Sequence, residues 1–113
     1  MAATLPWAAR ALALAAALAA SAAAAQADDI GEGRNKARAC AVCHGVLGLS
    51  VAPDTPNLAG QPASYLVQQL RAYRSGARRH EVMAVMAKPL QDSDIDQLAA
   101  WFAAIRVEAS PPR

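Results

Sequence analysis

The sequence predicts a small all-α domain that follows an N-terminal export signal. Three segments carry apolar residues at helical spacing, and no segment shows the alternating pattern of a strand. A Cys-x-x-Cys-His motif at the end of the first of these segments links the domain to a prosthetic group. A chain of this size has a thin core, which a flat apolar cofactor would enlarge.

The first element is an apolar leader over residues 1–27. One basic residue, Arg10, precedes a run of Ala and Leu with a single Ser over 11–25, and Ala-Gln-Ala at 25–27 suits a signal-peptide cleavage site. The alternative is a retained membrane anchor, but the apolar run is shorter than the about 20 residues that a spanning helix needs and is poor in Leu, Ile and Phe. We therefore expect cleavage after Ala27, a periplasmic location and no membrane span in the mature protein.

The mature chain is expected to be one domain over residues 28–113. Removing 27 of the 113 residues leaves 86, and the formal net charge falls from +2 to +1 because Arg10 leaves with the leader. This nearly neutral balance gives no indication of a nucleic-acid partner. Much of the overall apolar content is leader alanine, so it does not indicate a membrane protein.

The first helix of the mature domain is predicted from about Asp29 to the cysteine motif. Gly31 and Gly33 lie in its early turns. Two interpretations of these glycines stay open: they permit the close approach of another backbone segment, or they reflect fraying at the start of the chain.

Cys40-Ala41-Val42-Cys43-His44 is the attachment signature of a covalently bound c-type haem, and it uses both cysteines of the chain. Two thiols about one helical turn apart reach the two vinyl groups on one edge of the porphyrin, and the imidazole that follows falls beneath the iron. Cys40 and Cys43 are therefore predicted to bind the haem, and His44 to be the proximal iron ligand. The motif occurs once, so one haem is expected.

Three other interpretations of the motif are weaker. A structural disulfide is compatible with an oxidising compartment but leaves His44 without a role. A thioredoxin-like redox pair requires a βαβ pattern, which is absent. A zinc site formed by Cys40, Cys43, His44 and His80 would have a histidine directly beside its second cysteine, which does not match the usual ligand spacing.

Two further helices follow a loop-rich connection. Pro62 suits the first turn of the second helix, which Ser75-Gly76 ends. Acidic residues over 92–96 suit the start of the third helix through capping and the helix dipole. One face of the third helix carries Ile95, Leu98, Ala99, Phe102 and Ile105.

Five motifs lie between residues 28 and 107: Cys40-x-x-Cys43-His44-Gly45, Pro56-Asn57-Leu58-Ala59-Gly60-Gln61, Tyr65-Leu66-x-x-Gln69-Leu70, Met83-x-x-Met86 and Leu98-Ala99-Ala100-Trp101-Phe102. Together they resemble one family, the class I c-type cytochromes, in particular small bacterial carriers of the cytochrome c-553 type and single domains of their dihaem relatives. The resemblance implies a class I cytochrome c fold, all-α, with N- and C-terminal helices that cross and one covalent haem held between loops.

The resemblance also implies a methionine as the sixth iron ligand, which favours reduced iron and raises the potential. In the family this ligand lies seven residues before the leucine that precedes the last helix, and counting back from Leu90 selects Met83. Met86 is the fallback and otherwise fills space beside the haem. His80 is an alternative ligand, although its charged neighbours indicate a solvated position.

A haem histidine generally donates its other ring N–H to a fixed acceptor. In the resembling family a proline carbonyl accepts this hydrogen bond, and Pro56, twelve residues after His44, is the candidate. Pro53 is the fallback acceptor. Both prolines can also act only by stiffening a loop.

Two surface features bear on partner recognition. Loop 46–51 has leucines where relatives commonly have Asp and Asn, so it either docks a partner beside the haem edge or packs on the porphyrin. A basic cluster in the second helix and after it either steers acidic redox partners or is a solvated face. The cluster consists of Arg71, Arg74, Arg78 and Arg79.

The sequence therefore predicts a periplasmic electron-transfer protein, not an enzyme, that carries single electrons on a His/Met-ligated haem between redox protein partners. The first alternative is a haem subunit that functions only inside a periplasmic oxidoreductase or dehydrogenase complex, and the apolar loop slightly favours it. The second is a haem enzyme or sensor with an open sixth position. The two methionines argue against an open position.

Overall fold

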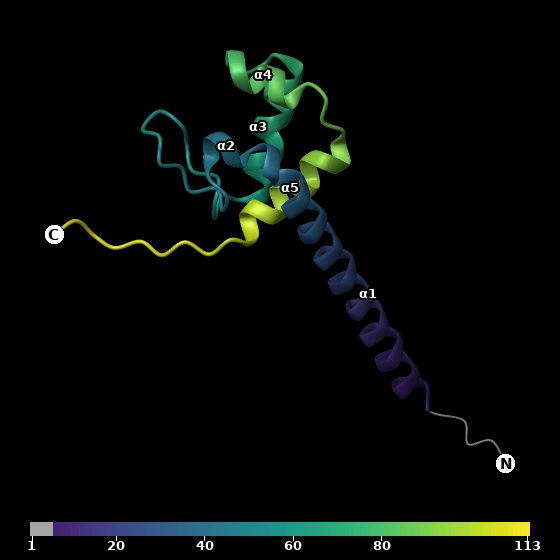
Figure 1. The fold of residues 1–113 in the computed structure, drawn as a ribbon. Coiled ribbons are helices and arrows are strands. Elements are labelled where there is room, and N and C mark those ends of the chain that lie inside the picture. The colour runs from purple at the N-terminus through teal and green to yellow at the C-terminus, as the bar shows by residue number, and fades with distance from the viewer. Residues whose placement is uncertain (1–5) are drawn as a thin grey trace.

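The computed structural model describes residues 6–113, and these residues form helices and loops without a strand (Figure 1). The all-α class predicted from the sequence is confirmed. Residues 1–5 of the predicted leader lie outside the described residues. The helices are α1 (Trp7–Lys36), the 3₁₀ turn η1 (Ala37–Ala39), α2 (Ala41–His44), α3 (Ala63–Ser75), α4 (Glu81–Ala87) and α5 (Asp92–Ala104).

Helix α1 begins at Trp7, well before the Asp29 start predicted for the first helix. Ala and Leu are strong helix formers and no proline interrupts the segment, so the leader and the first helix of the domain join. Side chains 10–29 are exposed, and this part of α1 projects away from the other helices in Figure 1. Together α1 and η1 are long and apolar enough to cross a membrane, a test that a signal sequence also passes.

The C-terminal part of α1 crosses α5 at Gly33, which is buried. A Cβ atom at this position would overlap the backbone carbonyl oxygen of Gln97 and lie 2.9 Å from Cβ of Trp101. Nothing lies within 4 Å of a Cβ atom added at Gly31. The close approach of α5 therefore explains why position 33 is a glycine, but it does not explain the glycine at position 31.

Helix α5 supplies most of the core. It contacts α1 and α3, and α4 packs against α3. Ile95, Leu98, Ala99 and Phe102 are buried on the face predicted from their spacing, and Ile105 is half-buried. The main core cluster consists of Ala37, Leu66, Leu98, Ala99 and Phe102.

The boundaries of α3 follow the signals in the sequence, whereas α4 is a helix that the sequence analysis did not predict. Helix α3 begins after Pro62 and ends at Gly76, whose φ of 83° is the left-handed conformation that glycine adopts readily. At the start of α4, the Nδ1 atom of His80 accepts a hydrogen bond from the backbone N–H of Met83 at 3.3 Å. This cap stabilises a helix of only seven residues.

Asp94 supports both the helix crossing and the start of α5. Its Oδ1 lies 2.8 Å from Nζ of Lys36, and its Oδ2 accepts a hydrogen bond from the backbone N–H of Gln91, also at 2.8 Å. The Lys36 ammonium, and after it the Gln91 N–H, hold the pKa of the Asp94 carboxyl below its usual range. Such a carboxylate stabilises the fold above its unfolded pKa of about 3.9, and the stabilisation disappears as the pH falls through the lower folded value.

We expect Asp94→Asn to lower the thermal midpoint near pH 6 and to lose this deficit as the pH approaches about 2. Thermal unfolding followed by circular dichroism across this range measures the effect. Asp54→Asn, at an exposed loop position, is the matched control and should show no pH-dependent deficit. An Asp94→Asn deficit of equal size at both ends of the range would mean that Asp94 acts through packing rather than charge.

Candidate functional site

His44 is the one buried side chain of a charged or polar residue type among residues 6–113, with 7% of its surface exposed. It is the last residue of α2, and its backbone N–H donates to the carbonyl of Cys40 at 2.9 Å. Its ring atom Nδ1 lies 2.8 Å from the carbonyl oxygen of Pro56. A carbonyl only accepts, so in the neutral ring Nδ1 carries the proton and Nε2 keeps its lone pair. The ring is thereby oriented as a ligand with Nε2 as the donor atom.

The loop that presents Pro56 is held in place by polar contacts. The carbonyl of Gly48 accepts hydrogen bonds from the backbone N–H groups of Leu58 and Ala59, at 2.8 and 3.1 Å. The backbone N–H of Ser50 donates to Oδ1 of Asn57 at 2.7 Å. The Ser50 hydroxyl reaches the carbonyl of Cys43 at 3.1 Å. This loop thus connects the acceptor carbonyl to the helix that carries His44.

Ser50 and Asn57 are supporting residues that the sequence analysis did not single out. Asn57 lies in the Pro-Asn-Leu segment, so its place beside Pro56 was a usable signal. Ser50 gave no comparable signal, because its link to Cys43 depends on how the loop folds back.

Both cysteines are free thiols, so the structure has no disulfide between them. Cys40 is half-buried, and burial raises the pKa of its thiol, whereas Cys43 is exposed. The N–H of Cys43 donates to the carbonyl of Cys40 at 3.3 Å, which places the two thiols one turn apart on a single short helix. Two thiols and a buried, oriented imidazole are the donor set that a covalently attached haem requires, so these residues fit that group.

The other predicted ligands lie on a different element. Met83 is half-buried and Met86 is 39% exposed, both on α4. His80 caps the same helix. Within residues 6–113 no three Cys, His, Asp or Glu side chains gather as metal ligands, which gives the zinc interpretation with His80 no support.

Two of the four arginines of the predicted basic cluster pair with carboxylates in the folded chain. Arg74 donates to the carbonyl of Leu90 at 2.8 Å and to Asp92 at 2.6 Å. Arg71 lies 3.8 Å from Asp92 and 3.7 Å from Asp96.

The third member, Arg78, also has an internal partner. It donates to Oε1 of Gln69 at 2.7 Å and lies over the ring of Tyr73. These pairs favour the interpretation of the cluster as a solvated face, because three of its four charges interact within the chain.

Loop 46–51 is exposed at most of its apolar positions. Val46 and Val51 are 80% and 103% exposed, and Leu47 and Leu49 are 51% and 44% exposed. The docking interpretation requires such exposure at a protein surface.

Comparison with known proteins identifies the family of this chain. The sequence model of the cytochrome c family matches residues 30–105. The chain is similar to cytochrome c-554(548) of Halomonas halodenitrificans, with 42% identity over 67% of this chain and 95% of that protein. It is also 39% identical to the thiosulfate dehydrogenase electron acceptor of Thiomonas intermedia, over 67% of this chain and 36% of that protein.

A solved structure shows the same fold. The crystal structure of reduced recombinant cytochrome c4 from Pseudomonas stutzeri matches with a TM-score of 0.63 and 37% identity, over 66% of this chain and 44% of that one. The chain thus spans nearly all of the Halomonas protein and under half of the other two. It belongs to the cytochrome c family, whose members carry covalently bound haem c and act as electron carriers rather than enzymes.

Proposed function

We propose that this chain is an exported, periplasmic one-electron carrier with a single haem c. Cys40 and Cys43 would hold the haem, and His44 and Met83 would be the ligands of its iron. The observation that carries the proposal is the imidazole of His44, buried directly after two free thiols and oriented by the carbonyl of Pro56.

When bound, the haem supplies an iron that alternates between ferric and ferrous states while its ligands stay in place. The chain positions and tunes that iron. The hydrogen bond from His44 Nδ1 to the Pro56 carbonyl fixes the ring, with Nε2 as the atom free to bind iron. The loop of Pro56 is itself tied to Cys43 through Ser50, which holds the acceptor carbonyl beside the His44 ring.

Met83 is the proposed sixth ligand, with Met86 as the fallback. Two observations support the choice. Met83 is half-buried whereas Met86 is exposed. The backbone N–H of Met83 is also bonded to His80, which anchors this residue in the first turn of α4. The bond from the Met83 N–H to Nδ1 of His80 supports a capping role for His80 rather than iron ligation.

Residues 1–27 are proposed to be a cleaved leader, and residues 28–113 the functional domain. The exposure of side chains 10–29 supports this division, because none of residues 6–27 is buried. One contact close to the cleavage site joins two residues that are both retained: Nε2 of Gln97 donates to Oδ1 of Asp29 at 3.3 Å. Cleavage after Ala27 therefore leaves the crossing of α1 and α5 intact.

The redox partners are proposed to be proteins of the periplasm. The relative named as a thiosulfate dehydrogenase electron acceptor supports a dehydrogenase as the electron donor. A second candidate function is a haem subunit that stays inside such an oxidoreductase complex. The exposed apolar residues Val46, Leu47 and Val51 favour it, because a permanent interface would cover them.

The intact mass of protein purified from the periplasm tests this proposal. We expect the mass of residues 28–113 plus one haem, and a haem that acid acetone does not extract. A mass equal to the bare polypeptide would contradict covalent attachment, and a mass that includes residues 1–27 would contradict cleavage. Size-exclusion chromatography of the same periplasmic extract separates the two candidates, because a free carrier elutes as a small monomer and a subunit elutes with its complex.

A further inference from the structure

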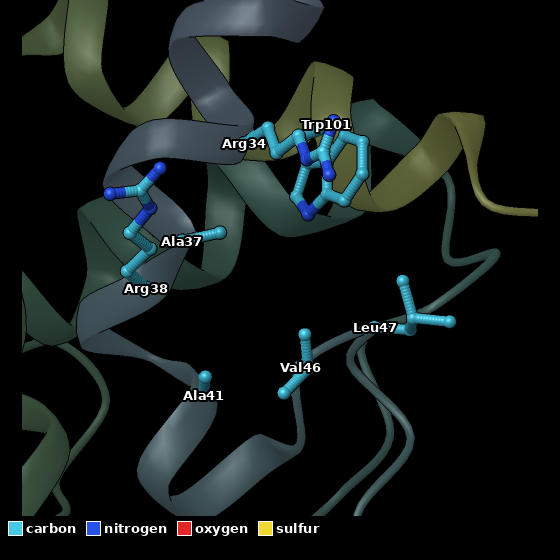
Figure 2. Close-up of a pocket in the computed structure, with 7 residues that line it drawn as sticks. All are labelled: Arg34, Ala37, Arg38, Ala41, Val46, Leu47 and Trp101. Atoms are coloured by element: carbon cyan, nitrogen blue, oxygen red, sulfur yellow. The ribbon is translucent and has the colours of Figure 1, made fainter.

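A pocket of about 280 Å³ lies beside the segment that holds the cysteines. Figure 2 shows the residues that line it, which come from α1, η1, α2, the loop after it and α5. Two arginines, Arg34 and Arg38, stand at its rim, and small or apolar side chains form its wall. The pocket combines positive charge with an apolar lining.

Trp101 contributes an unused hydrogen-bond donor to this pocket. Its Nε1 atom is buried and has no acceptor among residues 6–113. In Figure 2 the indole nitrogen is turned toward the space above Val46. The guanidinium carbon of Arg34 lies 5.8 Å from the centre of the indole ring. A buried N–H without a partner costs free energy, and an acceptor that reaches it after a movement of the surrounding side chains would remove that cost.

The charge at the rim is also uncompensated. Unlike Arg71 and Arg74, neither Arg34 nor Arg38 has a carboxylate within 4.0 Å or a side-chain hydrogen bond in the described part of the chain. Both residues are exposed. Arg34 already lies over the indole, whereas Arg38 extends along the outer side of the helix in Figure 2. An exposed arginine changes rotamer within nanoseconds, so Arg38 can turn toward a bound anion.

We propose that this pocket docks an acidic segment of the redox partner, with a carboxylate that meets Arg34 and the Nε1–H of Trp101. An apolar side chain next to that carboxylate covers Val46 and Leu47, which are 80% and 51% exposed. Guanidinium groups and an N–H donor select an anionic acceptor, and the apolar wall selects a hydrophobic neighbour. This inference rests on the proposed function, since it names the contact surface of that electron carrier.

The position of the pocket suits electron transfer. Ala41, one of its lining residues, stands between the two cysteines that are proposed to hold the haem. A partner seated there contacts the haem-bearing segment itself. The pocket also explains why loop 46–51 is apolar at its start, where the resembling family commonly has polar residues.

The indole N–H resonance of Trp101 in ¹H–¹⁵N spectra of the reduced, haem-loaded protein tests the proposal. The probe is a terminally blocked Leu-Glu-Glu-Leu peptide, and its Leu-Gln-Gln-Leu counterpart is the control. We expect the glutamate peptide to move the Trp101 resonance and the glutamine peptide to leave it in place. Trp7 leaves with the leader, and a Trp101→Phe variant assigns the signal.

Arg34→Gln should abolish most of the shift. Arg79→Gln, a change at an exposed arginine that does not line the pocket, should leave it intact. An equal response to both peptides, or an unchanged response in Arg34→Gln, would overturn the proposal. Haem content and reduction by a small-molecule reductant are checked in the same samples. A haem-loaded, redox-active protein whose Trp101 signal ignores the glutamate peptide refutes the docking site alone, whereas a protein without covalent haem refutes the proposed function.

The rate of oxidation by ferricyanide provides a second readout. Arg34→Gln/Arg38→Gln should slow this anionic oxidant by about fivefold at low ionic strength, and the difference should shrink as salt screens the charges. Arg79→Gln/Arg106→Gln carries the same change in net charge and should have a smaller effect. Equal slowing in the two double variants would overturn the proposal, because net charge alone would then explain the rates.

Discussion

Gly33→Ala is expected to destabilise the domain by about 3 kcal/mol, a large part of the stability of a small domain. The added methyl group would overlap the carbonyl oxygen of Gln97 and press on Cβ of Trp101. Both contacts belong to α5, so relief requires the two helices to separate along their crossing. Urea unfolding of the haem-loaded protein measures the change, and haem loading itself should fall if the apoprotein no longer folds.

Gly31→Ala is the matched control, because it makes the same chemical change two residues away in the same helix. Nothing lies within 4 Å of the added atom, and alanine has the higher helix propensity. This variant should be unchanged or more stable by up to about 1 kcal/mol. Similar losses of unfolding free energy in both variants would show that the effect comes from α1 itself and not from its crossing with α5.

The elements that the sequence predicted well are those with local signals. Helix α3 has a proline before it and a glycine after it, and α5 carries a regular apolar face. Helix α4 was missed because it is short and depends on a cap from His80, a residue outside the usual set of capping residues. The early start of α1 does not follow from the boundary predicted after Ala27, because the alanines of the leader continue the helix across it.

The predictable part of the site is the part within one motif. The order of Cys40, Cys43 and His44 predicts the cofactor. The resemblance predicts Pro56 as the hydrogen-bond acceptor, and its carbonyl lies 2.8 Å from Nδ1 of His44. Contacts between distant segments could not be predicted in the same way. Arg74 and Asp92 are 18 residues apart, and only the packing of α3 on α5 shows that they neutralise each other.

The docking pocket also depends on residues that are far apart in the sequence. Arg34 and Trp101 belong to the two crossing helices, and neither residue alone indicates a site. Only their juxtaposition beside loop 46–51 shows an uncompensated charge, an unused N–H and an apolar wall in one place. The arginine cluster that stands out in the sequence is therefore the weaker candidate for partner binding.

Met83→Ala is expected to remove the sixth iron ligand and to lower the reduction potential, because thioether ligation favours ferrous iron. The weak methionine-to-iron charge-transfer band in the far red of the ferric spectrum should disappear. Met86→Ala makes the same change three residues further along α4, at a more exposed position, and should retain both the band and the potential. His80→Ala should also retain the band, with a modest loss of stability from the missing cap.

A band that survives Met83→Ala and vanishes in Met86→Ala would reverse the assignment. If the unsubstituted protein lacks this band and its spectrum changes in His80→Ala, His80 would be the ligand instead. Its ring would then have to break the hydrogen bond with the backbone N–H of Met83.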